Sequence, residues 1–146
     1  DPAVIEEALL GHDAVAFAGA IGQPDANSGE LPCVYVELVA GATVSDEELM
    51  DYAGNNIGEA GAKPKHLEIL KELPKTAVGK VFKPDLRKMA ITRIFDQTLS
   101  EKNAKARVSG VKDDKKLGLV AQISGEASDA LIKEALQDFT IPWERS

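Results

Sequence analysis

The residue with the clearest chemical potential in this 146-residue sequence is Lys80, which ends a short segment of small and turn-forming residues. Residues 73–80 read Leu-Pro-Lys-Thr-Ala-Val-Gly-Lys. Pro74 restricts the backbone at the start of the segment, and Gly79 permits a sharp turn or a close approach to a ligand just before the lysine. Thr76 is a small polar neighbour in the same turn. A lysine displayed in this way offers a mobile point charge to phosphate or carboxylate oxygens.

The pattern around Lys80 differs from a nucleotide-binding P-loop. Val81 stands where that motif requires serine or threonine, and Pro74 stands where it requires the first glycine. A bare Gly-Lys pair is also common in ordinary surface turns, which are the simpler explanation for the pair taken by itself. The segment therefore indicates an anion-binding lysine only if its surroundings support that function.

Positive charge is concentrated around the same segment. The whole sequence has a formal charge of −7, which argues against nucleic-acid binding as its general function. Residues 63–88 nevertheless have a balance of +5, with eight Lys or Arg and three Asp or Glu residues, and the remaining 120 residues carry −12. An anionic ligand is expected in this region, although a solvated basic face would produce the same pattern.

Composition argues against several other kinds of site. The single cysteine, Cys33, cannot form an intramolecular disulfide, and with only two histidines the sequence predicts no metal site. Cys33 and His66 lie in expected strands and are interpreted as structural residues. No apolar run approaches the ~20 residues of a membrane span, and neither a start methionine nor a leader is present. We expect a fragment of a cytoplasmic protein without an integral membrane segment.

The elements that must position the loop are expected on both of its sides. A strand over residues 66–70 precedes it, and a helix that begins at Pro84 follows it. Two earlier strands are expected at residues 15–21 and 33–39, where apolar side chains dominate or alternate with polar ones. Between them, residues 22–29 are rich in Gly, Pro, Asp, Asn and Ser and predict a loop.

Two helices in the first half of the sequence are expected from their capping residues. Asp1 is a favourable N-cap, because proline follows it at the first helical position. A helix over residues 46–57 is predicted by a capping box, in which Ser45 is followed three residues later by glutamate. Gly58 and Gly61 are expected to end this helix.

The last part of the sequence predicts further small elements. Residues 100–105 are polar and predict a linker, and residues 107–111 and 117–124 predict a β-hairpin with a charged turn. Ser128 is expected to cap a final helix. The order of elements predicts an α+β fold, a small mixed sheet flanked by helices, with an added C-terminal β-hairpin and helix.

The stretch from Gly22 to Arg87 resembles the C-terminal domain of the adenylate-forming superfamily, which includes acyl-CoA synthetases, luciferases and the adenylation domains of peptide synthetases. Residues 74–80, Pro-Lys-Thr-Ala-Val-Gly-Lys, are similar to the signature loop of that domain. Other similar segments occur in the same order and at the expected spacing, at residues 1–4, 22–25, 29–36 and 63–67. The resemblance implies a lid domain over residues 1–95 and a C-terminal extension over residues 96–146.

The resemblance, which is to the acyl-CoA synthetase or fatty-acid–CoA ligase type, implies a two-step reaction. A carboxylate attacks the α-phosphate of ATP to give an acyl-adenylate and pyrophosphate, and CoA then forms acyl-CoA and releases AMP. Lys80 would be the catalytic residue of the first step, with Mg²⁺ sharing the phosphate charge. Support of the loop is expected from Thr76 and Gly79. Contacts with CoA or ATP phosphates are expected from Lys63, Lys65, Lys83 and Arg87.

The resemblance also implies a partner, a large N-terminal adenylation domain that would supply the ATP site, the carboxylic acid pocket and the Mg²⁺ ligands. Because the sequence contains no Ser/Thr/Gly-rich phosphate loop, we expect the chain alone to be inactive. Two alternatives remain open. The chain could be a free-standing α+β binding or interaction module, or the lid of an adenylating enzyme that uses a carrier protein instead of CoA.

Overall fold

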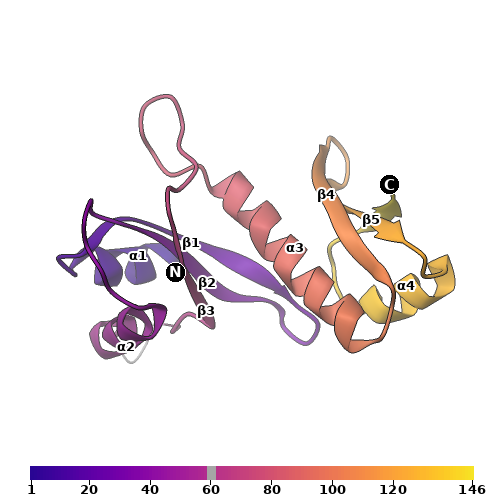
Figure 1. The fold of residues 1–146 in the computed structure, drawn as a ribbon, viewed down its shortest axis with the longest axis horizontal. Coiled ribbons are helices and arrows are strands. Elements are labelled where there is room, and N and C mark those ends of the chain that lie inside the picture. Colours follow the sequence, from indigo (N-terminus) through magenta and orange to yellow (C-terminus); the bar gives the residue numbers. More distant parts are fainter. Residues whose placement is uncertain (59–61) are drawn as a thin grey trace. The chain divides into compact units, whose positions relative to one another are not determined.

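The computed structural model describes residues 1–58 and 62–146, which form the expected α+β architecture (Figure 1). The helix end expected at Gly61 lies outside the described residues. Two compact units are present, one of residues 1–22 and 31–87 and the other of residues 23–30 and 88–146. In chain order the elements are α1 (Pro2–Leu10), β1 (Val15–Asp25), β2 (Gly29–Leu38), α2 (Asp46–Asn56), β3 (His66–Leu70), α3 (Lys83–Glu101), β4 (Ala106–Asp114), β5 (Gly118–Gly125), α4 (Asp129–Leu136) and β6 (Trp143–Arg145).

Capping side chains begin three helices as the sequence predicts. Oδ1 of Asp1 accepts a hydrogen bond from the backbone N–H two residues later, at 3.0 Å. Oγ of Ser45 and Oγ of Ser128 each accept one from the N–H three residues later, at 3.1 and 3.2 Å. Each bond satisfies an N–H group that the first turn of a helix leaves without a partner, so these local signals determine where α1, α2 and α4 begin.

The first sheet has the strand order β1-β2-β3. β2 and β3 are parallel, in register from Cys33 opposite His66 to Glu37 opposite Leu70. A parallel pair needs a crossover connection, and α2 lies in the segment that supplies it. The strand expected before the candidate loop is therefore confirmed, and its last residue leads directly toward that loop.

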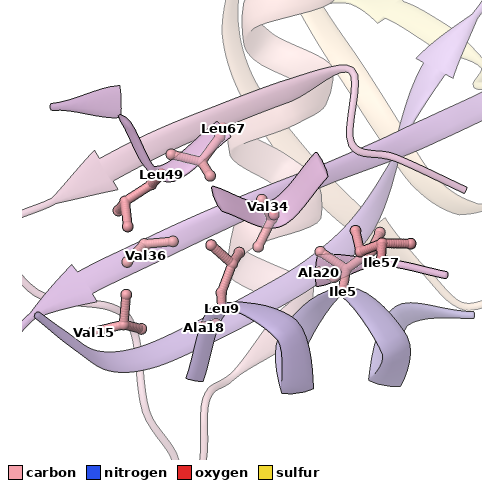
Figure 2. Close-up of a cluster of buried hydrophobic side chains, with 11 residues drawn as sticks. Ile5, Leu9, Val15, Ala18, Ala20, Val34, Val36, Leu49, Ile57 and Leu67 are labelled. Carbon is pink, nitrogen blue, oxygen red and sulfur yellow. The ribbon is translucent and has the colours of Figure 1, made fainter. Parts of the chain in front are cut away.

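A hydrophobic core joins this sheet to helices α1 and α2 (Figure 2). On α1, Ile5 and Leu9 are four residues apart and therefore lie on one face of the helix. They cluster with Val34 and Val36, which share one face of β2, and with Leu49 of α2. Burying each such side chain contributes about 1.5–3 kcal/mol, so β2 is a firmly held strand.

The prediction of a loop over residues 22–29 is wrong for its first half, because β1 continues to Asp25. Gln23 is buried, and its Oε1 accepts a hydrogen bond from the guanidinium group of Arg93 at 2.6 Å. Oδ2 of Asp25 accepts hydrogen bonds from the N–H and the Oγ of Ser28 at 2.9 and 2.8 Å. The bonds of Asp25 close the turn between β1 and β2, which is much shorter than the turn-rich composition suggested.

The second unit contains the C-terminal β-hairpin and helix predicted from the sequence. β4 and β5 are antiparallel, with Asp114 opposite Gly118 across the charged turn. β5 also pairs in parallel with β6, a strand that was not predicted. β6 has three residues, too few to show an alternating pattern, and it directly follows Pro142.

Helix α3 extends two residues into the polar stretch predicted as a linker, and its apolar face continues up to the residue directly before that stretch. Ile91, Phe95 and Leu99 recur at four-residue intervals and are buried. The helix ends at Glu101, so only the last four residues of the predicted linker at 100–105 connect two elements. The three helix residues share their core with side chains of β4, β5 and α4: Val108, Ala121, Ile123, Ile132 and Leu136.

Candidate functional site

The candidate loop forms a short turn that ends at Lys80 and is visible in Figure 1 as the open loop before α3. Lys75 and Val81 form an antiparallel bridge at its base. The N–H of Thr76 donates to the carbonyl of Lys80 at 2.7 Å, and the N–H of Lys80 donates to Oγ1 of Thr76 at 3.2 Å. Gly79 has a φ of +84°, in the left-handed region that favours glycine. Thr76 and Gly79 therefore shape the turn that presents Lys80.

Lys80 itself is exposed to solvent. Among residues 1–58 and 62–146, it forms no ion pair with an acidic side chain. Its neighbour Val78, at the tip of the turn, is 81% exposed. The ammonium group is therefore available to an anion that approaches from outside this chain.

The start of the loop is held by Glu37, near the end of β2. Its Oε1 accepts a hydrogen bond from the backbone N–H of Leu73 at 2.9 Å and one from Nζ of Lys75 at 2.7 Å. Nζ of Lys75 also lies 4.4 Å from the centre of the Phe17 ring, a cation–π contact. Burial acts to raise the pKa of Glu37, but the hydrogen bonds from Lys75 and Leu73 outweigh it and lower the pKa below its ordinary value.

The end of the loop packs against Gly19 of β1. A Cβ built at Gly19 would lie 2.9 Å from Cγ1 of Val81 and 2.6 Å from Cδ1 of Leu86, both closer than real side chains approach. The N–H of Phe82 donates to the carbonyl of Pro74 at 2.7 Å, which ties this end to the start of the loop. The missing side chain at Gly19 therefore lets the segment after the candidate lysine approach the sheet.

Three residues that hold the loop were not expected from the sequence. Glu37 had a visible signal, since it is the one charged residue in the stretch 33–38 of β2. Phe17 and Gly19 had no comparable signal, because an aromatic residue or a glycine within a strand can have many packing roles. Their function becomes apparent only from the contacts with the loop.

The other lysine and arginine residues expected at phosphates have mixed surroundings. Three of them are exposed: Lys63, Lys65 and Arg87. Nζ of Lys83 instead forms an ion pair with Oε2 of Glu6 at 2.9 Å, and the same oxygen accepts a hydrogen bond from a backbone N–H of β1 at 2.8 Å. In the described part of the chain, no hydrogen bond or ion pair connects any of these four residues to Lys80.

His66 and Cys33 occupy structural positions. Nε2 of His66 lies 3.0 Å from Oε1 of Glu68 on the same strand, and its ring meets that of Tyr35 edge-on. Cys33 has no exposed surface. Within the described ranges, no three His, Cys, Asp or Glu side chains gather as metal ligands, and no helix combines the length and apolar character needed to cross a membrane.

The chain matches the family model of the AMP-binding enzyme C-terminal domain over residues 4–80, a match that ends at the candidate lysine. It is 43% identical over 99 residues to marinolic acid–CoA ligase of Pseudoalteromonas sp. (strain SANK 73390). The aligned segment covers 68% of this chain and 15% of that ligase. It is 32% identical over 137 residues to an acyl-CoA ligase of Purpureocillium lilacinum. That aligned segment covers 88% of this chain and 36% of the ligase.

A solved structure shows the same fold. The structure of an acyl-CoA synthetase from Brucella canis superposes with a TM-score of 0.52 at 35% sequence identity. The superposition covers 59% of this chain and 16% of that synthetase. The chain thus spans between 15% and 36% of the length of these similar proteins.

Proposed function

Because the chain belongs to the family of AMP-binding enzyme C-terminal domains, we propose that it is the lid domain of an ATP-dependent acyl-CoA synthetase. The similarity to two CoA ligases and an acyl-CoA synthetase supports this choice within the family. The observation that carries the proposal is the accessibility of the Lys80 ammonium group. Within the described residues it is exposed and free of ion pairs, at the end of a turn shaped by Thr76 and Gly79.

In the proposed reaction, a carboxylic acid such as a fatty acid attacks the α-phosphate of ATP. Pyrophosphate leaves and an acyl-adenylate forms. In the second step the thiol of CoA attacks the acyl carbon, which gives acyl-CoA and AMP. A large N-terminal adenylation domain would supply the pockets for ATP and the acid, and this chain would supply the lysine.

Lys80 would act in the first step, in which two anions must approach each other. Its ammonium group would bridge an oxygen of the attacking carboxylate and an oxygen of the α-phosphate. This placement offsets their repulsion and holds the reacting atoms in line. Removal of such a preorganised charge is expected to slow adenylation by about 10²–10³-fold, or about 3–4 kcal/mol of barrier.

The remaining cations are proposed to contact the phosphates of CoA or ATP. Lys63, Lys65 and Arg87 are exposed and can do so directly. Lys83 would first have to leave its ion pair with Glu6, so we expect it to contribute least. Bound Mg²⁺ would share the phosphate charge, and its ligands would come from the N-terminal domain, which would also hold the ATP.

We place the lid over residues 1–95 and interpret residues 96–146 as an extension. In support, the family match covers residues 4–80. The similarity to the Purpureocillium lilacinum ligase, over 88% of this chain, reaches into the extension and supports its presence in acyl-CoA ligases. A hinged lid can present different faces in successive steps, which would allow one domain to serve both half-reactions.

The proposal places the enzyme in the cytoplasm, which is supported by the presence of only one cysteine in the sequence, since it cannot form an intramolecular disulfide. It requires no nucleic acid, in keeping with the formal charge of −7. The chain alone should release no pyrophosphate from ATP in the presence of magnesium and fatty acids, because the adenylation domain would hold both substrates.

Lys80→Ala in the full-length enzyme tests the proposal by separating the two half-reactions. Adenylation, measured as acid-dependent exchange of pyrophosphate into ATP, is expected to fall by about 10²–10³-fold. Formation of acyl-CoA from pre-made acyl-adenylate should be spared. Lys71→Ala removes an exposed lysine outside the loop and should leave both steps unchanged. An equal loss of both half-reactions, or no loss of adenylation, would contradict the role of Lys80.

A further inference from the structure

The two lysines of the loop differ in their surroundings. Lys80 is exposed, whereas Nζ of Lys75 is enclosed by three partners. These are the carboxylate of Glu37 at 2.7 Å, the carbonyl of Leu73 at 3.3 Å and the ring of Phe17 at 4.4 Å. Lys75 is therefore a bound, structural cation, although it belongs to the same short segment as the candidate catalytic lysine.

The carboxylate of Glu37 also holds the backbone of the loop. The oxygen that accepts from Lys75 accepts from the N–H of Leu73 as well, so one atom holds both a side chain and the main chain. Glu37 extends from β2, whose neighbouring residues Val34 and Val36 are wholly buried. A side chain on a rigid strand is a firm support for a functional loop.

The backbone of Lys75 connects this support to Lys80. Lys75 forms the antiparallel bridge with Val81, the residue directly after Lys80. Inside the bridge, the N–H of Thr76 donates to the carbonyl of Lys80 at 2.7 Å. A displacement of Lys75 would therefore be passed to Lys80 through two adjacent backbone contacts.

We propose that Glu37 and Lys75 are positioning residues for adenylation, which hold the loop so that Lys80 reaches the reacting groups in productive geometry. The inference rests on the proposed role of Lys80 in the acyl-CoA synthetase reaction. Glu37 and Lys75 act through the loop backbone and do not touch the substrates. A misplacement of about 1 Å can slow an enzymatic step by about 10²-fold, so loss of the support is expected to cost about tenfold or more.

Three substitutions in the full-length enzyme test this role. Glu37→Gln and Lys75→Met are expected to lower kcat of pyrophosphate exchange by about tenfold or more, with a smaller change in KM for ATP. Conversion of pre-made acyl-adenylate to acyl-CoA should be unchanged. Lys75→Arg keeps the positive charge and can keep the cation–π contact with Phe17. This variant should therefore retain most of the activity that Lys75→Met loses. Lys71→Met and Glu72→Gln change exposed residues nearby and should behave like the unmodified enzyme.

A double variant separates positioning from general stability. In the Lys80→Ala background, Glu37→Gln should cause no further loss of adenylation, because the lysine to be positioned is gone. A further loss there, or an equal loss in both half-reactions, would overturn the inference. If Glu37→Gln and Lys75→Met leave adenylation unchanged while Lys80→Ala abolishes it, the positioning role fails and the proposed function stands. If Lys80→Ala has no effect, both fail.

Discussion

Gly19 leaves no room for a side chain beside Val81, where the candidate loop returns to the first sheet. A Cβ at Gly19 would lie only 2.9 Å from Cγ1 of Val81, and it would also meet the wholly buried side chain of Leu86. Glycine at this position in β1 therefore determines how closely the chain after Lys80 approaches the strand.

Gly19→Ala should destabilise the chain, because the added methyl group overpacks this contact. We expect the free energy of unfolding, measured with urea, to fall by about 1–3 kcal/mol, with a larger loss for Gly19→Val. Gly54→Ala is the matched control, since a Cβ there would meet only the Lys63 side chain at an ordinary 3.9 Å. In α2 this change should raise stability by up to about 1 kcal/mol. Equal effects at both glycines would contradict the packing role of Gly19.

Substitutions of Gly79 should reveal whether its backbone conformation matters for the loop. The φ of +84° is strained for other residues, at a cost of about 1–2 kcal/mol, and least so for asparagine. A Cβ at Gly79 would meet nothing within 4 Å, so only the backbone is affected. In the full-length enzyme, Gly79→Val should lower pyrophosphate exchange more than Gly79→Asn. Identical rates for the two variants would argue against a required left-handed residue before Lys80.

Glu37 should make a component of the stability depend on pH. Burial acts to raise its pKa, but hydrogen bonds from Lys75 and Leu73 lower it below the ordinary value in the folded chain. The unfolded chain therefore binds the proton more readily. This stability is fully present above about pH 4.3, the ordinary pKa of glutamate, and is lost as the pH falls through the folded value.

Glu37→Gln should accordingly be less stable than the unmodified chain at neutral pH, and the difference should shrink as the pH falls below about 4.3. Urea unfolding at a series of pH values measures this difference. Glu72→Gln, at an exposed glutamate, controls for the loss of one negative charge. A difference that stays constant from neutral to acidic pH would show that the charge of Glu37 does not stabilise the fold.

Truncation tests the proposed boundary between the lid and its extension. A chain that ends at Phe95 keeps Ile91 and Phe95 but loses the side chains that cover them, which come from residues after the boundary. We expect this chain to bind a hydrophobic dye and to associate, whereas a chain that ends at Arg87, the limit of the first compact unit, should do so much less. Dye fluorescence and sedimentation measure both effects. The lid proposed over residues 1–95 would therefore need its extension to cover Ile91 and Phe95. A monomeric 1–95 chain without dye binding would contradict this dependence.

Local sequence signals were sufficient for most elements and for the choice of loop. Asp1, Ser45 and Ser128 begin their helices as predicted, because a cap and its N–H partner lie within three residues. The β-hairpin near the C-terminus and the turn at Gly79 were also recognisable, because turn-forming residues likewise act over a few positions. Element lengths were less predictable, since β1 and α3 extend into stretches whose composition predicts a loop or linker. Tertiary contacts, such as the burial of Gln23 and of Leu99 just before the linker, outweigh local composition there.

The sequence alone thus determined the α+β order of the elements up to α4, the family resemblance and the lysine at the end of its turn. Only the tertiary structure decided which residues hold that turn in place. Glu37 meets Lys75, and Gly19 meets Val81, across long stretches of chain for which no spacing rule exists. Such contacts form where strands and loops that are distant in the sequence pack together. They depend on hydrogen-bond geometry and close packing, which exist only in the folded chain.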